Sequence, residues 1–168
     1  MGGEYAERRA QAEAGARALG VDSLRDVPFE GALDACEGLT DPIVRKRSRH
    51  IIHEIERVRE FAAALETGSI RDNLEKIAGL LNASHDSLRD DYEVTVPELD
   101  VAVDAARTAG AHGARMTGGG FGGSVIALVD AERVEAVADA VARAFAEHSF
   151  AAPAFFLATP SRGAGRDR

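Results

Sequence analysis

The sequence predicts an α+β fold in which long antiparallel helices come first and a β-β-α-β tail follows. Two observations support this fold class. Apolar residues recur at three- and four-residue intervals through most of residues 44–88, which is the period of amphipathic helices. After residue 110 the period changes, and short apolar runs flank residues 118–123, of which five are glycine. No linker or internal repeat divides the 168 residues, so one domain over residues 1–168 is expected.

The first helix is expected over residues 4–19, which are rich in Ala, Glu, Arg and Gln, with Gly20 at its C-terminal cap. A long helix should run from Pro42 to near Gly68, because Asp41 can cap an N-terminus that carries proline in its first turn. Its apolar stripe consists of Val44, Ile51, Ile55, Val58, Ala62 and Leu65.

The next helix is expected over residues 70–90, after a capping-box pattern at Ser69 and Asp72. Its stripe consists of Ile70, Leu74, Ile77, Leu81, Ser84 and Leu88. Because only a short turn separates this helix from the preceding one, the two should pack antiparallel.

A shorter helix should begin at Thr95, which stands at capping-box spacing from Glu98, and end at Gly110. The tail then comprises strands at 113–117 and 124–129, a helix at 131–148 and a last strand at 154–159. The polar residues 162–168 are expected to fray.

The chain carries 28 acidic and 20 basic residues, and 5% of its residues are aromatic. Its net charge of −8 argues against nucleic-acid binding, and the basic run at 45–49 is interpreted as a solvated helix face. No apolar run of 18 residues indicates a membrane span. Cys36 is the only cysteine and is interpreted as a small buried hydrophobe, so a cytoplasmic protein is expected.

The glycine-rich stretch MTGGGFGGSVIALV, residues 116–129, requires a backbone role, because each ordered glycine costs about 0.5–1 kcal/mol relative to alanine. Gly118, Gly120 and Gly123 have the spacing of a dinucleotide-binding motif, but a strand follows them instead of a helix. No lysine marks a Walker loop. Two interpretations remain: a turn with bulges, or a loop whose bare backbone presents N–H groups or admits a neighbouring phosphate-binding element.

Residues 116–123, MTGGGFGG, are similar to the third motif of the galactokinases, which belong to the GHMP small-molecule kinase superfamily. Residues 82–100, NASHDSLRDDYEVTVPELD, and residues 4–9, EYAERR, resemble two further galactokinase segments. Ser124 stands where the galactokinases usually have cysteine. The resemblance implies the ferredoxin-like C-terminal domain of this superfamily.

The galactokinase sugar signature, the Gly-Leu-Ser-Ser-Ser phosphate loop and the catalytic acid and arginine do not occur here. We therefore expect a C-terminal domain that has no catalytic residue and no metal site, and whose partner is an N-terminal half. In the intact enzyme, ATP and Mg²⁺ would serve the transfer of a phosphoryl group to the C1 hydroxyl of D-galactose. The fragment alone should fold, bind no cofactor, be inactive and self-associate through its exposed domain interface.

The resemblance places one set of residues beside the phosphate end of the ATP cleft: Thr117, Gly118, Gly119, Gly120, Phe121, Gly122, Gly123 and Ser124. It associates Tyr5 with the sugar pocket, where a phenol can donate a hydrogen bond to a sugar hydroxyl. The alternative for Tyr5 is an exposed residue at a helix start.

Other polar residues are interpreted structurally. His50 and His53 have a spacing that can bind zinc, but no third ligand is nearby in the sequence. His85 is expected to donate to a backbone carbonyl in the core. Asp90 and Asp91 should point apart and into water.

Two alternative functions remain open. One is a galactokinase-like sensor that responds to sugar and ATP by binding a regulatory protein. The other is a kinase for a related sugar, such as an amino sugar. Phe121 argues against the second, because other branches of the superfamily write this loop with an Ala-Gly pair.

Overall fold

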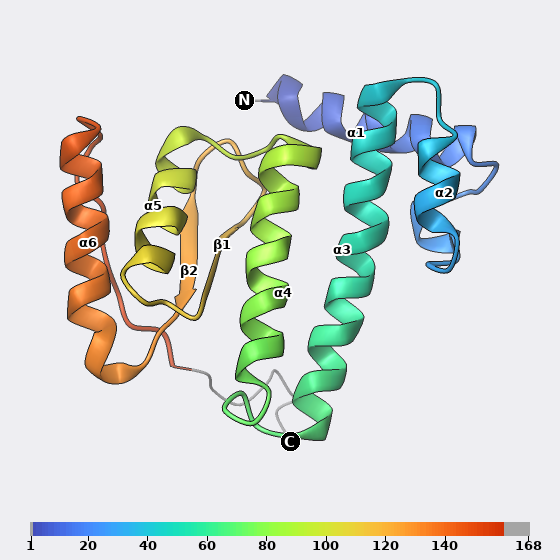
Figure 1. Cartoon of the computed structure of the whole chain (residues 1–168). Helices are drawn as coiled ribbons and strands as arrows, with labels where there is room; N and C mark the ends of the chain where they lie inside the picture. Colours follow the sequence, from blue (N-terminus) through green and yellow to red (C-terminus); the bar gives the residue numbers. More distant parts are fainter. Residues whose placement is uncertain (1, 160–168) are drawn as a thin grey trace, which may run out of the picture.

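The computed structural model describes residues 2–159 and confirms the α+β class. Figure 1 shows a small sheet with α5 and α6 on one side, α4 and α3 on the other, and α1 crossing one end of α3. The elements are α1 (Gly2–Ala18), α2 (Ala32–Glu37), α3 (Pro42–Thr67), α4 (Leu74–Ser87), α5 (Pro97–Thr108), β1 (Gly113–Thr117), β2 (Ser124–Leu128) and α6 (Val134–Glu147).

The antiparallel pairing of the two long helices, α3 and α4, is confirmed. The side chain of Asp41 accepts hydrogen bonds from the first N–H groups of α3, as its sequence position indicated. The helix α4 begins four residues later than the sequence predicts. Ser69 and Asp72 bond to each other and close a turn, and the helix begins only at Leu74.

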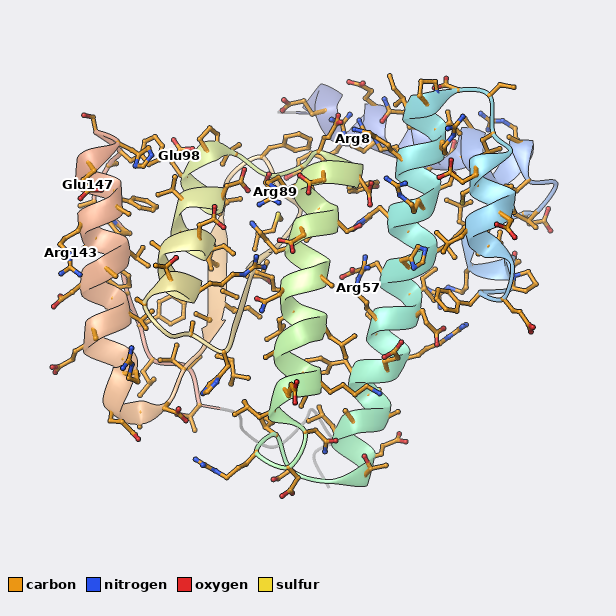
Figure 2. All side chains as sticks on the ribbon, viewed as in Figure 1. Arg8, Arg57, Arg89, Glu98, Arg143 and Glu147 are labelled. Carbon is orange, nitrogen blue, oxygen red and sulfur yellow. The ribbon has the colours of Figure 1, made fainter. Side chains whose placement is uncertain are left out.

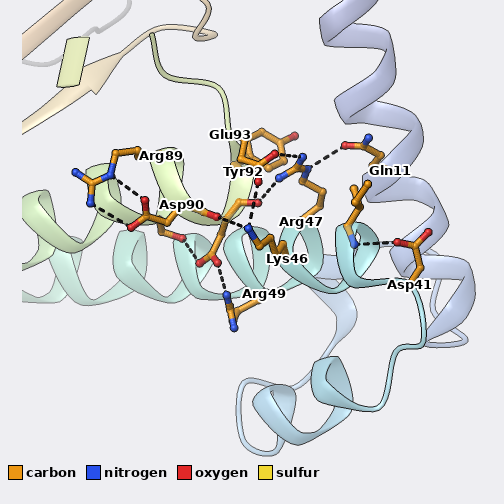
Figure 3. A network of polar contacts seen from close by, with 12 residues as sticks. Gln11, Asp41, Lys46, Arg47, Arg49, Arg89, Asp90, Tyr92 and Glu93 are labelled. Carbon is orange, nitrogen blue, oxygen red and sulfur yellow. Dashed lines mark hydrogen bonds and ion pairs between the residues drawn. The ribbon is translucent and has the colours of Figure 1, made fainter. Parts of the chain in front are cut away.

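One π-helical turn, Leu88–Tyr92, follows α4 and ends at Glu93, which adopts the left-handed conformation with φ 54°. In the basic run at 45–49, Lys46, Arg47 and Arg49 bond to this turn, and Arg45 bonds to Leu39 and Glu37. The interpretation of the run as a solvated face is therefore wrong. The buried Arg47 donates to Gln11 at 3.0 Å and to Glu93 at 2.7 Å, and Lys46 also binds Glu93 (Figure 3). Adjacent residues of a helix project about 100° apart, so part of a five-residue run must face the neighbouring elements.

The helix α5 begins without the expected cap. The hydroxyl of Thr95 donates to Asp100 instead, and the N-cap residue Val96 contributes no side-chain hydrogen bond. Gly110, with φ 102°, ends the turn after α5. The helix α6 packs on α5 and buries Val137, Val141 and Phe145 in the largest apolar cluster of the described residues.

The strands β1 and β2 pair antiparallel, with Gly113 opposite Leu128 and Thr117 opposite Ser124. The third strand, expected at 154–159, is not formed. Residues 151–159 have no regular secondary structure, and Phe156 and Leu157 are 85% and 77% exposed. An apolar run becomes a strand only where another strand supplies hydrogen bonds, and this segment has no such partner in the described part of the chain. The tail 162–168 lies outside the described residues.

Two short helical segments were not anticipated, Leu24–Asp26 and α2. They cover the junction of α1 and α3, where Cys36 is buried as expected. Burial raises the pKa of its thiol. Of the helices in residues 2–159, none has the length and apolar character that crossing a membrane requires.

Candidate functional site

The glycine-rich loop, residues 118–123, closes the hairpin between β1 and β2. Most of its residues have a positive φ: Gly118 (97°), Gly120 (89°), Phe121 (59°), Gly122 (123°) and Gly123 (115°). Glycine adopts this region at no steric cost, so the interpretation as a turn explains part of the composition. Phe121 is the exception, and its side chain is held by packing.

Close approach explains the rest of the composition. A Cβ atom on Gly120 would lie 2.5 Å from the carbonyl oxygen of Val94, and the N–H of Phe121 donates to the same oxygen at 2.7 Å. A Cβ atom on Gly119 would lie 2.7 Å from the ring of Tyr5. The turn interpretation is therefore confirmed, and Gly120 serves both the turn and a close approach, whereas the approach of a phosphate-binding element stays a prediction. Within the described residues, the groups that come close are Val94 and Tyr5.

The structure brings Tyr5 to the loop. Its hydroxyl donates to the carbonyl oxygen of Gly120 at 3.1 Å, and its ring stands edge-on to Phe121 with the centroids 5.4 Å apart. The side chain is still 47% exposed. Tyr5 is therefore an exposed residue near the start of α1, as the alternative interpretation expected, and it is also a partner of the loop.

Arg8 was missed by the sequence analysis. It projects from α1 towards the segment after α4 (Figure 2), where it donates to the carbonyl oxygens of Tyr92 at 2.9 Å and Glu93 at 3.0 Å. Its guanidinium carbon lies 5.8 Å from the ring centroid of Phe121. The sequence feature that could have identified Arg8 is its position three residues after Tyr5, because residues three apart share a helix face. Arg8 places a positive charge beside the loop.

The loop has unused hydrogen-bond donors. The N–H groups of Gly118, Gly119 and Gly122 form no hydrogen bond within the described part of the chain, and the hydroxyl-bearing Thr117 and Ser124 are exposed beside them. Successive backbone N–H groups in such turns can bind anionic oxygens, as phosphate-binding loops do. The loop is therefore suited to contact a phosphate group.

The side chains that can bind metal ions are dispersed in the described part of the chain. Across residues 2–159, no group of three or more His, Cys, Asp or Glu side chains is placed to hold a metal ion. The two histidines on α3 also have separate partners. His50 bonds to Ser87 at 2.9 Å and stacks on Tyr92, whereas His53 stands edge-on to Phe29. Burial lowers the pKa of His50 to about 4.

His85 is fully buried, as expected, but its hydrogen bond runs the other way. Its Nδ1 accepts the N–H of Met116 at 3.1 Å, whereas donation to a carbonyl was predicted. Burial lowers its pKa, which favours the neutral form that this bond requires.

The expectation for the adjacent aspartates is half correct. They do point apart, and Asp90 is exposed beside Arg89. The carboxylate of Asp91, however, is turned inward and binds Ser87 and Arg49. The positive charges on α3 account for this difference.

Comparisons with known proteins agree with the geometry. Residues 52–147 match the family model described as GHMP kinases C terminal. Galactokinases of Streptomyces coelicolor and Mycobacterium tuberculosis are 52% and 48% identical to this chain over 98% and 99% of its length. A crystal structure of Lactococcus lactis galactokinase complexed with galactose superposes with a TM-score of 0.78, at 39% identity over 87% of this chain.

The chain spans only part of these proteins. It covers 42% and 45% of the two curated relatives and 38% of the crystallised one. The likenesses confirm the resemblance drawn from residues 4–9, 82–100 and 116–123.

Proposed function

Because the chain belongs to the GHMP kinase C-terminal family, we propose that it is the C-terminal domain of a galactokinase. The longer protein would transfer the γ-phosphoryl group of ATP to the C1 hydroxyl of D-galactose. Support comes from the identity of about one half to curated galactokinases along nearly the whole chain. The contact between Tyr5 and Gly120 is the observation on which the assignment of the site depends most, because it joins the two segments assigned to sugar and to phosphate.

Phosphoryl transfer depends mainly on positioning and on stabilising charge. We assign the loop from Thr117 to Ser124 to the phosphate end of the ATP cleft, where its free N–H groups would donate to phosphate oxygens. The exposed phenol of Tyr5 would donate to a sugar hydroxyl, and its ring would exclude water from one side of the pocket. Arg8 would hold the segment 92–94 that supports the loop.

The remaining parts of the reaction are assigned to the section of the longer protein outside this sequence. Mg²⁺ would neutralise charge on the phosphate oxygens, but its ligands would come from ATP and from that other section. The same holds for the acid, the arginine and the serine-rich loop that galactokinases use. We therefore propose that this domain is inactive alone and that its partner is the N-terminal half. The single buried thiol of Cys36 is compatible with a reducing cytoplasm, which we propose as the compartment.

The test is a sugar kinase assay on the longer protein, with D-galactose and D-galactosamine as acceptors and the 168-residue chain as the negative control. ATP-dependent phosphorylation of galactose is the expected result. Turnover of galactosamine alone would identify a kinase for a related sugar. Binding of galactose and ATP without turnover, measured by calorimetry, would identify a sensor.

A matched control variant is available on the far side of the molecule. Glu147 lies on the outer face of α6, away from the loop (Figure 2). Glu147→Gln should leave the kinetics unchanged, whereas Tyr5→Phe should raise the KM for the sugar.

A further inference from the structure

The strand β1 has two edges, and only one of them pairs with another strand. That edge bonds to β2, while the other lies alongside α4 (Figure 1). An edge without a neighbour leaves a row of N–H and C=O groups that need partners, because these groups are costly to bury unpaired. Ala114 and Met116 belong to this edge and are fully buried.

Two side chains of α4 accept the N–H groups of this edge, whereas Arg107 of α5 and Arg115 donate to the carbonyl oxygens of Ala114 and Met116. The Oδ1 of Asn82 accepts the N–H of Ala114 at 3.0 Å, and the Nδ1 of His85 accepts the N–H of Met116 at 3.1 Å. The Nδ2 of Asn82 also donates to the carbonyl oxygen of His112 at 3.3 Å. The pairing is thus continued by side chains instead of by a third strand.

The spacing of the two acceptors suits this role. Residues 114 and 116 point to the same edge and lie about 6.8 Å apart along a strand. Residues 82 and 85 are three apart and therefore share one face of a helix, with Cβ atoms about 5–6 Å apart. Two acceptors on one helix face can therefore reach alternate N–H groups of a strand that runs in the same direction.

The backbones are also close enough. A Cβ atom on Gly113 would lie 2.8 Å from the carbonyl oxygen of Ala78 in α4, so the start of β1 lies directly against the helix. This contact is independent of the two hydrogen bonds. It shows that β1 is held at a distance that the side chains of Asn82 and His85 can span.

His85 extends the contact to a third element. Because its Nδ1 accepts a hydrogen bond from the N–H of Met116, the ring proton of the neutral imidazole must be on Nε2. This atom lies 3.3 Å from Oδ1 of Asp100 in α5, with no hydrogen bond between the two. The other oxygen of Asp100 accepts the hydroxyl of Thr95. The buried imidazole therefore joins α4 to β1 by a hydrogen bond and lies close to Asp100 of α5.

We propose that Asn82 and His85 replace a neighbouring strand at the free edge of β1 and are positioning residues for the glycine-rich loop. Met116 directly precedes Thr117, so the bond to His85 fixes the point at which the chain enters the loop. The role of His85 and Asn82 in positioning a phosphate-binding loop rests on the proposed function. Their pairing with the edge of β1 is independent of that function.

The first experiment measures the pairing itself on the 168-residue chain. Nitrogen NMR should show His85 with its proton on Nε2, and hydrogen exchange reports the amides of Ala114 and Met116 separately. In His85→Asn the amide oxygen is attached to Cγ, the atom that carries Nδ1 in histidine, so an acceptor is kept in that place. In His85→Gln the amide group is attached one bond further along the side chain. We expect the Met116 amide to exchange within about threefold of the wild-type rate in His85→Asn, and at least tenfold faster in His85→Gln.

Asn82→Asp and Asn82→Leu form the corresponding pair for Ala114, since only the first keeps an acceptor. Equal exchange of Met116 in both His85 variants would overturn the proposal. Finding the ring proton of His85 on Nδ1 in the wild-type chain would also overturn the proposal. This measurement does not depend on the folding of any variant.

The second experiment measures ATP kinetics in the longer protein. His85→Gln should lower kcat/KM for ATP at least tenfold, and His85→Asn should restore most of it. Wild-type kinetics in both variants would overturn the positioning role even if the exchange results were as expected. If the wild-type protein phosphorylates no sugar, the proposed function fails, and the tautomer and the exchange rates still decide the edge pairing.

Discussion

The hydroxyl of Tyr5 donates a 3.1 Å hydrogen bond to the carbonyl oxygen of Gly120, although 115 residues separate the two in the sequence. The bond joins the first turns of α1 to the loop between β1 and β2. Phe121 adds an edge-on aromatic contact to Tyr5, and the guanidinium carbon of Arg8 lies 5.8 Å from the centroid of the Phe121 ring. The start of α1 and the loop are therefore one structural unit.

Removing parts of the Tyr5 side chain should separate these contributions. Tyr5→Phe loses only the hydrogen bond and should lower the free energy of unfolding by about 1 kcal/mol. Tyr5→Ala also loses the aromatic contact with Phe121, which contributes about 0.5–1.5 kcal/mol beyond buried area. Urea unfolding of the chain measures both. Equal stability of the alanine variant and the wild type would show that the contact does not hold α1 to the loop.

Two glycines with similar φ values should respond differently to the same substitution. Gly118 and Gly120 both have positive φ, but an added Cβ meets open space at Gly118 and the carbonyl of Val94 at Gly120. Gly118→Ala should therefore cost about 1 kcal/mol, which is the conformational penalty alone. Gly120→Ala should cost at least about 2 kcal/mol, because the loop must also move off Val94. Equal losses in urea unfolding would show that the loop yields freely at this contact.

The buried His50 should make stability depend on pH. Its pKa in the folded state is about 4, against about 6.5 in an unfolded chain, so folding requires the neutral form. The stabilisation is complete above pH 6.5 and is lost as the pH falls from 6.5 towards 4. The loss reaches about 3 kcal/mol at the lower limit. In His50→Gln the free energy of unfolding should not fall with pH through protonation of residue 50. The difference in this free energy between wild type and variant should therefore shrink as the pH falls. Parallel curves between pH 7 and pH 4 would contradict the assignment.

Local signals in the sequence predicted the elements whose ends are set locally. Asp41 and Pro42 specify the start of α3 by themselves, because the carboxylate of Asp41 accepts the N–H groups of Ile43 and Val44, only two and three residues further along the chain. The same kind of signal failed at Ser69 and Asp72, where the two side chains satisfy each other and close a turn without starting a helix. A capping pattern therefore marks a place where the chain can turn, and tertiary contacts decide whether the helix begins there.

Features that depend on distant residues could not be predicted. The burial of Arg47 requires Glu93 and Gln11, which lie 46 and 36 residues away. The glycine-rich loop was located correctly, but its support by Val94 and Tyr5 follows only from the packing of α1 and of the turn after α4. In the segment 154–159 the apolar composition indicated a strand, whereas strand formation depends on a partner that the composition does not contain.

The last prediction decides whether the loop belongs to the active site. A Cβ atom added to Gly122 has no neighbour within 4 Å, and the φ of this residue is 123°. Gly122→Ser should therefore cost only the conformational penalty of about 1 kcal/mol of stability. If the loop lies against the phosphates of ATP, the added group occupies the place of the nucleotide. A displacement on the order of 1 Å can lower the rate about a hundredfold. ATP kinetics and melting temperature of the longer protein, measured on the same variant, separate the two effects.

Gly119→Ser is the matched comparison, because its side chain meets the ring of Tyr5 first, and the added substitution Tyr5→Ala should relieve that clash. Normal ATP kinetics in Gly122→Ser, together with a lowered melting temperature, would place the loop outside the active site.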